Sequence, residues 1–253
     1  MSAAAGHALA DRVALITGAA SGQGQAAALL FAGAGARIAV VDVDDAGAAA
    51  TVAQVIAAGG EAIALHADVS ERAAVDRMVA ATVDRFGRLD VLYNNAAVQM
   101  SGRLVDCSDA DWDRTIATNL SAIFWACRAA VPHLRASGRG SIINTASVLG
   151  LIGAEGYAAY GAAKAGLVAL SRQLATELAP TVRVNVIAPG RFPSKMTQHI
   201  ATDEAAMAED TALIPMQRWG REEEMAALAI SLASTAGAYM TGVIVPIDGG
   251  FSL

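Results

Sequence analysis

Short apolar runs alternate with helical patterns along the whole chain. Seven apolar runs predict strands, over residues 13–16, 37–41, 62–65, 91–93, 141–144, 182–187 and 243–245. Helices are expected between them, over about residues 23–34, 45–58, 75–86 and 156–179, with a long one starting after Ser108. Ser108 is followed three residues later by Asp111, as at a capped helix start, and the next apolar residues keep to one helix side.

This alternation predicts the fold class. Strands separated by helices form a parallel sheet with helices on both faces, and such sheets are hydrophobic throughout. No linker and no repeat interrupts the pattern, so we expect one α/β domain over residues 1–253, with a flexible N-terminus at 1–10. The expected architecture is a doubly wound sheet of about seven strands that binds ligands at the carboxyl ends of its strands.

The composition excludes a disordered chain and argues against a membrane protein. The 253 residues are 55% hydrophobic, and the mean hydropathy is +0.43. The longest uncharged stretch, residues 13–36, is interrupted by a glycine-rich polar segment, whereas a spanning helix needs about 20 mostly apolar residues. The first ten residues lack the features of a signal peptide. We expect a cytoplasmic protein with no membrane partner.

Charge and ligand-type residues narrow the function further. The chain carries 18 basic and 24 acidic residues, for a net charge of −6, and no basic block, so nucleic acid is not an expected partner. Two cysteines, Cys107 and Cys127, are too few for a disulfide framework and read as buried or half-buried thiols. The four histidines show no ligand spacing, and no metal is expected.

A glycine-rich turn follows the first strand and opens a helix, from Thr17 to Gly24. Glycines there let backbone N–H groups approach a pyrophosphate, although a glycine cluster alone also occurs in ordinary turns. Asp42 ends the second strand, where a carboxylate accepts hydrogen bonds from ribose hydroxyls and repels a 2′-phosphate. Asp42 could instead cap a helix, but Asp44 and Asp45 are better placed for that. The sequence therefore predicts NAD(H) rather than NADP(H).

A second group of residues indicates proton transfer. Tyr160 and Lys164 are four residues apart, so they lie on one helix face, and an adjacent ammonium is expected to favour the phenolate. Ser147 follows the fifth strand, at the sheet edge where its hydroxyl can bind a substrate oxygen. A Tyr and a Lys at this spacing also occur by chance on helix surfaces, so the argument depends on the dinucleotide turn beside them.

With these motifs the chain resembles a short-chain dehydrogenase/reductase over nearly its whole length. The matching residues are Thr17, Gly18, Gly22, Gly24, Asn94–Asn95–Ala96, Asn119, Ser147, Tyr160, Lys164, Pro189–Gly190 and Asp248–Gly249–Gly250. The resemblance implies a Rossmann-like fold and assigns Tyr160 as general acid/base. It implies that Ser147 orients the substrate, that Lys164 binds the nicotinamide ribose and lowers the tyrosine pKa, and that Asn119 holds a water in a proton relay.

The resemblance also implies the residues that bind the cofactor. The expected set, running from the pyrophosphate and adenosine ends to the nicotinamide end, is Gly18, Ser21, Gln23, Gly24, Asp42, Val43, Asp68, Val69, Asn95, Ala96, Ala97, Tyr160, Lys164, Pro189, Gly190, Phe192 and Ser194. Three of the chain's residues depart from the family pattern. Gln23 replaces a bulky aliphatic residue, Ala97 stands where glycine is usual, and Arg191 replaces an apolar residue. Arg191 either pairs with an anionic substrate or forms a salt bridge to a surface carboxylate such as Glu155.

The substrate site is predicted less sharply. Pocket candidates are Val98, Gln99, Leu149, Glu155, Tyr157 and Arg191. Residues 191–220 give no strand signal and are expected to form a substrate lid, with Met196, Met207 and Ile214 either as apolar walls or as ordinary core residues.

These observations predict an NAD(H)-dependent oxidoreductase that interconverts a secondary alcohol and a ketone of a small-molecule substrate. One alternative is an NADPH-dependent 3-oxoacyl-[acyl-carrier-protein] reductase. Relatives of that kind commonly carry a basic residue after the Tyr/Lys helix, where this chain has Ala179–Pro180–Thr181, although Arg128 and Arg172 could substitute. A second alternative is a non-catalytic dinucleotide-binding protein. The family resemblance implies a homotetramer or a homodimer, with the apolar tail 239–253 packed across a two-fold axis.

Overall fold

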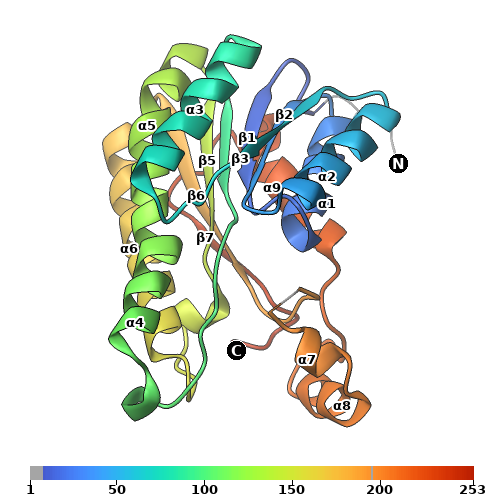
Figure 1. Ribbon diagram of the computed structural model, residues 1–253, viewed down its shortest axis with the longest axis vertical. Helices are drawn as coiled ribbons and strands as arrows, with labels where there is room; N and C mark the ends of the chain where they lie inside the picture. Colours follow the sequence, from blue (N-terminus) through green and yellow to red (C-terminus); the bar gives the residue numbers. More distant parts are fainter. Residues whose placement is uncertain (1–7, 195) are drawn as a thin grey trace.

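The computed structural model describes residues 8–194 and 196–253 and contains one parallel sheet (Figure 1). Its seven strands lie in the order β3-β2-β1-β4-β5-β6-β7, and every pairing is parallel. They are β1 (Val13–Thr17), β2 (Arg37–Asp42), β3 (Ala62–His66), β4 (Val91–Asn94), β5 (Gly140–Thr145), β6 (Val182–Pro189) and β7 (Ile244–Ile247). The predicted doubly wound sheet and all seven predicted strands are confirmed.

Helices cover both faces of the sheet. They are α1 (Gly22–Gly33), α2 (Asp45–Ala57), α3 (Arg72–Phe86), α4 (Asp109–Ile116), α5 (Ala122–Ser137), α6 (Ala158–Leu178), α7 (Gln198–Ala201), α8 (Glu204–Ala212) and α9 (Glu222–Ala233). Helices α3, α5 and α6 lie on one side, and α1, α2 and α9 on the other (Figure 1). Each side has its own buried apolar cluster against the sheet. The inner strands are therefore buried on both faces, which explains why they read as continuous apolar runs, whereas the edge strands β3 and β7 are partly exposed.

The helix starts follow the local sequence. Asp44 caps α2, since its carboxylate accepts a hydrogen bond from the backbone N–H of Gly47, and Ser108 caps α4 by accepting one from Asp111. The long helix predicted after Ser108 is interrupted by a π-helical turn at Ala117–Ser121, between α4 and α5. Helix α9 was not predicted, although the three glutamates of its first turn were an available signal for a helix start.

The reversal of strand order places a crevice at one sheet edge. Strands β2 and β4 lie on opposite sides of β1, so the connections after β1 and β4 turn away from each other at their carboxyl ends. Ligands of doubly wound folds bind at this switch point.

The N-terminal segment was expected to be flexible over residues 1–10. Residues 1–7 lie outside the described part of the chain. Leu9 is fully buried and its N–H donates to the carbonyl of Ala34, so the expectation is wrong at this position, because Leu9 packs into the core cluster beside α1. Within the described residues, no helix is long and apolar enough to cross a membrane.

Candidate active site

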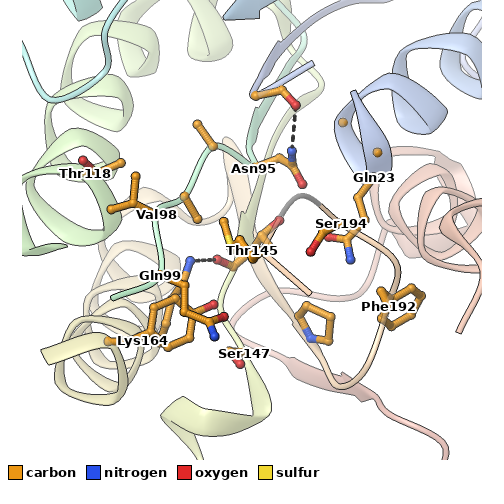
Figure 2. Close-up of a pocket in the computed structure, with 18 of the residues that line it drawn as sticks. Gln23, Asn95, Val98, Gln99, Thr118, Thr145, Ser147, Lys164, Phe192 and Ser194 are labelled. Carbon is orange, nitrogen blue, oxygen red and sulfur yellow. Dashed lines mark hydrogen bonds between the residues drawn. The ribbon is translucent and has the colours of Figure 1, made fainter. Parts of the chain in front are cut away.

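A cleft of about 440 Å³ opens at the carboxyl ends of the strands (Figure 2). It extends from the turn after β1 to the segment after β6. All the residues that the family resemblance assigned to the cofactor line this cleft, as does Ser147. The residues come from six separate connections of the fold, and the sheet brings them together.

In the turn between β1 and α1, glycines allow the backbone to lie close to the segment after β4 and to itself. Gly18 has φ +66°, and a Cβ there would lie 2.8 Å from the Cα of Ala96; a Cβ on Gly24 would collide with the carbonyl oxygen of Gly18. Thr17 Oγ1 accepts hydrogen bonds from the N–H groups of Asn95 and Ala96, and Asn95 Nδ2 donates to the carbonyl of Thr17 at 3.1 Å. These contacts fix the turn against the segment after β4, and its geometry fits a dinucleotide pyrophosphate.

Asp42 is held rigidly at the end of β2. Its Oδ2 accepts from the N–H of Ala20 at 3.0 Å, and its Oδ1 accepts from the N–H groups of Val43 and Asp44. Asp44, not Asp42, caps the following helix. The lining residues from the turns after β1, β2 and β3 include Asp42, Asp44 and Asp68 and, in the part of the chain that the structure describes, no lysine or arginine. This end of the cleft is therefore acidic.

Tyr160, Lys164 and Ser147 all line the cleft. Figure 2 shows Lys164 and Ser147 in the lower part of the view. Helix α6 places Tyr160 and Lys164 on one face, with Lys164 Nζ 5.6 Å from the centre of the tyrosine ring. Lys164 is buried, and its Nζ donates to the carbonyl of Thr145 at 2.7 Å. Ser147 Oγ accepts from the N–H of Leu149, at the start of the short turn after β5.

Burial dominates the protonation of this group. It raises the pKa of Tyr160 to about 12, against the opposing effect of a hydrogen bond with Ser147. It lowers the pKa of Lys164 to about 7, because a charged ammonium is poorly solvated there. Lys164 is not among the causes of this shift, and the lowering of the tyrosine pKa by Lys164 stays a prediction.

Asn119 lies behind the cleft rather than in its wall. The side chain is fully buried in the π-helical turn. Its Oδ1 accepts from the N–H of Val98 at 3.0 Å, and its Nδ2 donates to the carbonyl of Val98 at 2.7 Å. These two hydrogen bonds fix the segment after β4, whose residues Asn95–Val98 line the cleft. The proton-relay role of Asn119 stays a prediction.

The predicted substrate residues divide into two groups. Val98, Gln99, Leu149 and Arg191 line the cleft, whereas Glu155 and Tyr157 do not. Glu155 is exposed, and Tyr157 stands at the N-cap position of α6, near enough to Tyr160 to raise its pKa. Both residues lie in the segment between β5 and α6, outside the cleft lining.

The predicted lid is folded, not structureless. Residues 191–220 contain α7 and α8, which extend away from the sheet (Figure 1). Met196 lines the cleft as expected. Met207 lies instead in a shallow groove formed by α7, α8 and Gln217. Ile214 is buried, and a Cβ on Gly249 would meet its side chain. Neither residue lines the cleft: Met207 lies on α8, which carries it to the groove, and Ile214 follows α8 and is buried, in line with its alternative interpretation as an ordinary core residue.

Arg191 forms an ion pair, but not with the expected partner. Its Nη2 lies 2.9 Å from Oδ1 of Asp210 on α8, and its guanidinium lies over the ring of Phe251, 5.5 Å from the ring centre. The expected pairing with Glu155 is wrong because α8 brings Asp210 to this position. The guanidinium that was expected to bind an anionic substrate is therefore already paired with the carboxylate of Asp210.

Several lining residues were not found from the sequence. They are Val41, Asp44, Ala67, Ser70, Arg114, Thr118, Thr145, Ala146, Val148, Thr197 and Phe251. Arg114 and Thr118 are four residues apart and precede Asn119, so helical spacing was an available signal for them. Phe251 has no such signal, because only the folded chain brings the C-terminal segment to the cleft.

Comparisons with known proteins agree with this geometry. A family model described as enoyl-(acyl carrier protein) reductase matches residues 18–252. The chain is 46% identical to a rhamnolipids biosynthesis 3-oxoacyl-[acyl-carrier-protein] reductase of Pseudomonas aeruginosa, over 97% of this chain and 98% of the relative. It is 40% identical to the 2,5-dichloro-2,5-cyclohexadiene-1,4-diol dehydrogenase LinX of Sphingobium indicum, with the same coverage.

Solved structures give the same result. The Pseudomonas aeruginosa RhlG/NADP active-site complex has a TM-score of 0.94 and 44% identity, with full coverage of both chains. Levodione reductase has a TM-score of 0.92 and 36% identity, over 96% of this chain and 98% of that chain. By the matching model, the identity over its full length and the fold, the chain belongs to the short-chain dehydrogenase/reductase family of oxidoreductases.

Proposed function

We propose that the protein is an NAD(H)-dependent oxidoreductase that interconverts a secondary alcohol and a ketone. The observation that carries the proposal is the position of Ser147, Tyr160 and Lys164 in the same cleft as the glycine turn and Asp42. The nicotinamide cofactor, when bound, supplies or accepts the hydride.

The residues of the chain hold the cofactor along the cleft. The backbone of the turn Gly18–Gly24 would bind the pyrophosphate, and the carboxylate of Asp42 the adenosine ribose. Lys164 would bind the second ribose from the middle of the cleft. Pro189 and Gly190, at the end of β6, border the nicotinamide end of the same cleft.

Tyr160 moves the proton. With a pKa of about 12 its phenol is protonated at neutral pH, which suits it to donate a proton to a ketone oxygen. In the reverse direction it needs help to release that proton. The Ser147 hydrogen bond favours the phenolate, and a Lys164 that is charged near neutral pH would add to this effect. Ser147 also orients the substrate oxygen.

Asp42 is the residue on which the preference for NAD(H) over NADP(H) is argued. A fixed carboxylate in an acidic end of the cleft would repel the 2′-phosphate of NADP, and the described residues of that end supply no cation to offset the repulsion.

A second candidate function is an NADPH-dependent 3-oxoacyl-[acyl-carrier-protein] reductase. The observation that favours it is the 46% identity to the Pseudomonas aeruginosa reductase of that name, together with the likeness to the RhlG/NADP complex. Arg128 and Arg172 are exposed and available to an acidic carrier protein. A non-catalytic dinucleotide-binding role is disfavoured because the Ser, Tyr and Lys are all present in the cleft.

The remaining proposals follow from the family resemblance. We propose a homotetramer, or a homodimer, acting on a small-molecule substrate without nucleic acid, membrane or metal. A cytoplasmic location stays a prediction.

A Tyr160→Phe variant tests the function. We expect the variant to bind NADH as the wild type does, measured by tryptophan quenching, and to reduce ketones slower by about 10²-fold or more. The wild type is assayed with NADH and NADPH on simple cyclic ketones and on a 3-oxoacyl thioester. Wild-type turnover by the variant would exclude Tyr160 as the acid. A wild type that prefers the thioester with NADPH would favour the second function.

A further inference from the structure

An ion pair joins the lid to the wall of the cleft. Arg191 follows directly on the Pro189–Gly190 segment at the end of β6, and Asp210 lies on α8 of the lid. Their side chains meet at 2.9 Å and are 23% and 9% exposed. Charges this far from water interact more strongly than a surface pair does.

Other segments hold Arg191 in this position. Its guanidinium stacks over Phe251 of the C-terminal segment. Its backbone carbonyl accepts from the N–H of Gly220, where the lid returns to the fold. Arg191 and Phe251 line the cleft, whereas Asp210 is not among its lining residues. The carboxylate therefore meets the guanidinium from behind the cleft wall.

The pair is incompletely hydrogen-bonded. Arg191 Nε and Asp210 Oδ2 are buried, and neither has a hydrogen-bond partner in the described chain. Arg–carboxylate pairs frequently make two parallel bonds, and buried polar atoms are normally satisfied. A buried pair is weak evidence for stability in any case. Stability alone therefore gives no reason for this pair.

Its charge gives a clearer reason. Among the described residues of the cleft wall, the cations are Arg114, Lys164 and Arg191, and of these Arg191 is the one with a carboxylate ion pair. With Asp210 at 2.9 Å, this part of the wall is close to neutral. A substrate carboxylate brought here would meet the guanidinium and the repelling Asp210 together.

We propose that Asp210 determines substrate specificity by masking the charge of Arg191, so that the site accepts neutral carbonyl compounds and rejects carboxylates at this wall. Repulsion built against the wrong ligand is a common source of specificity. The substrate class named in this inference rests on the proposed function. The effect of the ion pair on the binding of a carboxylate does not.

The test compares a keto acid with its own ester. Levulinate and ethyl levulinate share one ketone and differ in charge. We expect Asp210→Asn to shift the kcat/KM ratio of ester to acid toward the acid by about tenfold or more, since it exposes the charge of Arg191. The variant Arg191→Met should shift the ratio the other way, because Asp210 is then the uncompensated charge. Shifts in one direction for both variants would overturn the proposal, and so would no shift.

Matched controls separate charge from structure. Glu224 pairs with Arg218 at 2.8 Å outside the cleft lining, so Glu224→Gln should leave the ratio unchanged. The double variant Arg191→Met/Asp210→Asn should lose the preference for the acid that Asp210→Asn gains. If Asp210→Asn lowers both rates equally, Asp210 acts on the lid fold alone and the proposal fails. If that variant does not fold, the direction of the shift in Arg191→Met decides.

A binding measurement needs no turnover. Calorimetry with benzoate and benzamide compares a carboxylate with its neutral isostere on the protein–NADH complex. Asp210→Asn should bind benzoate about tenfold more tightly than the wild type does, at unchanged benzamide affinity. A wild type that reduces no ketone, with this gain present, would reject the proposed function and keep the inference. A wild type that reduces ketones, with no gain in benzoate affinity in Asp210→Asn, would keep the proposed function and reject the inference.

Discussion

Lys164 occupies an unusual position for a lysine, because it is buried against the carbonyl of Thr145. The unfolded chain leaves its ammonium in water, and folding lowers its pKa to about 7. Between this value and the ordinary value of 10.5, the unfolded state binds more protons than the folded state does. The free energy of unfolding therefore rises with pH across that window. Burial of Lys164 therefore lowers the stability of the fold below about pH 10.5, and the role proposed for it in the cleft gives a reason for keeping it there.

A Lys164→Met variant tests this at the level of stability. Methionine has a similar length and no charge, so the variant should be more stable than the wild type, and the gain should be largest below about pH 7. The gain should shrink as the pH rises toward about 10.5. Urea unfolding at several pH values measures it, with the exposed Arg128→Met as the control. A gain that is the same at every pH would contradict the assigned burial effect.

Asp42 sets a second prediction at this scale. The variant Asp42→Asn keeps the shape of the side chain but removes its charge and replaces one acceptor oxygen with an NH2 donor. We expect the wild type to bind NADH at least about tenfold more tightly than NADPH, which corresponds to ~1.4 kcal/mol, and the variant to lose most of that difference. Tryptophan quenching titrations with both cofactors measure it. The exposed Asp45, which pairs with His66, gives the control Asp45→Asn. Equal or tighter NADPH binding by the wild type would reject Asp42 as the selector.

At the scale of the element, the π-helical turn between α4 and α5 decides how Asn119 acts. The turn departs from the regular spacing of backbone hydrogen bonds in an α-helix. Within it, the buried side chain of Asn119 forms hydrogen bonds with both the N–H and the carbonyl of Val98. Such turns occur frequently at functional sites. The helix thus supports the cleft wall through one side chain.

Two substitutions at Asn119 separate its contacts. Asn119→Asp keeps an acceptor for the N–H of Val98 but sets a buried carboxylate against its carbonyl, whereas Asn119→Leu loses both hydrogen bonds and carries no charge. Each buried neutral group left without a partner costs roughly 1–3 kcal/mol and an unpaired buried charge costs more, so the aspartate variant should be the less stable one. Urea unfolding measures the difference, and NADH titration reports on the adjacent segment Asn95–Ala96. Equal stability of the two variants would show that the Val98 contacts are not the source of the effect.

The lid shows the limit of reading an element from its sequence. The mixed polarity of residues 191–220 gave no strand signal and no helix was expected there, but the segment contains α7 and α8; its role as a lid stays a prediction. Two short helices rotate Met207 out of the cleft and bring Asp210 to Arg191. Helices of this length are specified by their contacts with the rest of the fold, not by local preference.

At the scale of the whole molecule, the sheet has apolar clusters on both faces, and some apolar side chains remain outside them. Tyr239 and Leu253 are fully exposed in the single chain, and Phe124 is 43% exposed. Apolar surface of this kind is a feature of proteins that associate. These exposed side chains are the reason for proposing a homotetramer in which the apolar tail, residues 239–253, lies in an interface.

Sedimentation equilibrium tests the assembly. We expect a particle of about four times the chain mass of 25.7 kDa at micromolar concentration. The double variant Tyr239→Glu/Leu253→Glu should lower that mass if the tail lies in an interface. Leu213→Glu, in the exposed part of the lid, is the control. A monomeric wild type would reject the proposal.

The sequence by itself determined the sheet and the edge at which the candidate site lies. The inner strands are buried on both sides, so their apolar runs predict them without knowledge of distant contacts. Gly18, Asp42, Ser147 and Tyr160 lie at fixed offsets from strand or helix ends, so topology alone carries them to one edge. Information of this kind is local, because it depends on period and spacing.

The tertiary structure decided what depends on distant partners. It alone showed that burial raises the pKa of Tyr160 and lowers that of Lys164, since desolvation is set by the surrounding fold. It also gave Arg191 its partner Asp210 and brought Phe251 to the cleft. Pairings between residues far apart in the chain follow from packing, and no periodicity in the sequence records them.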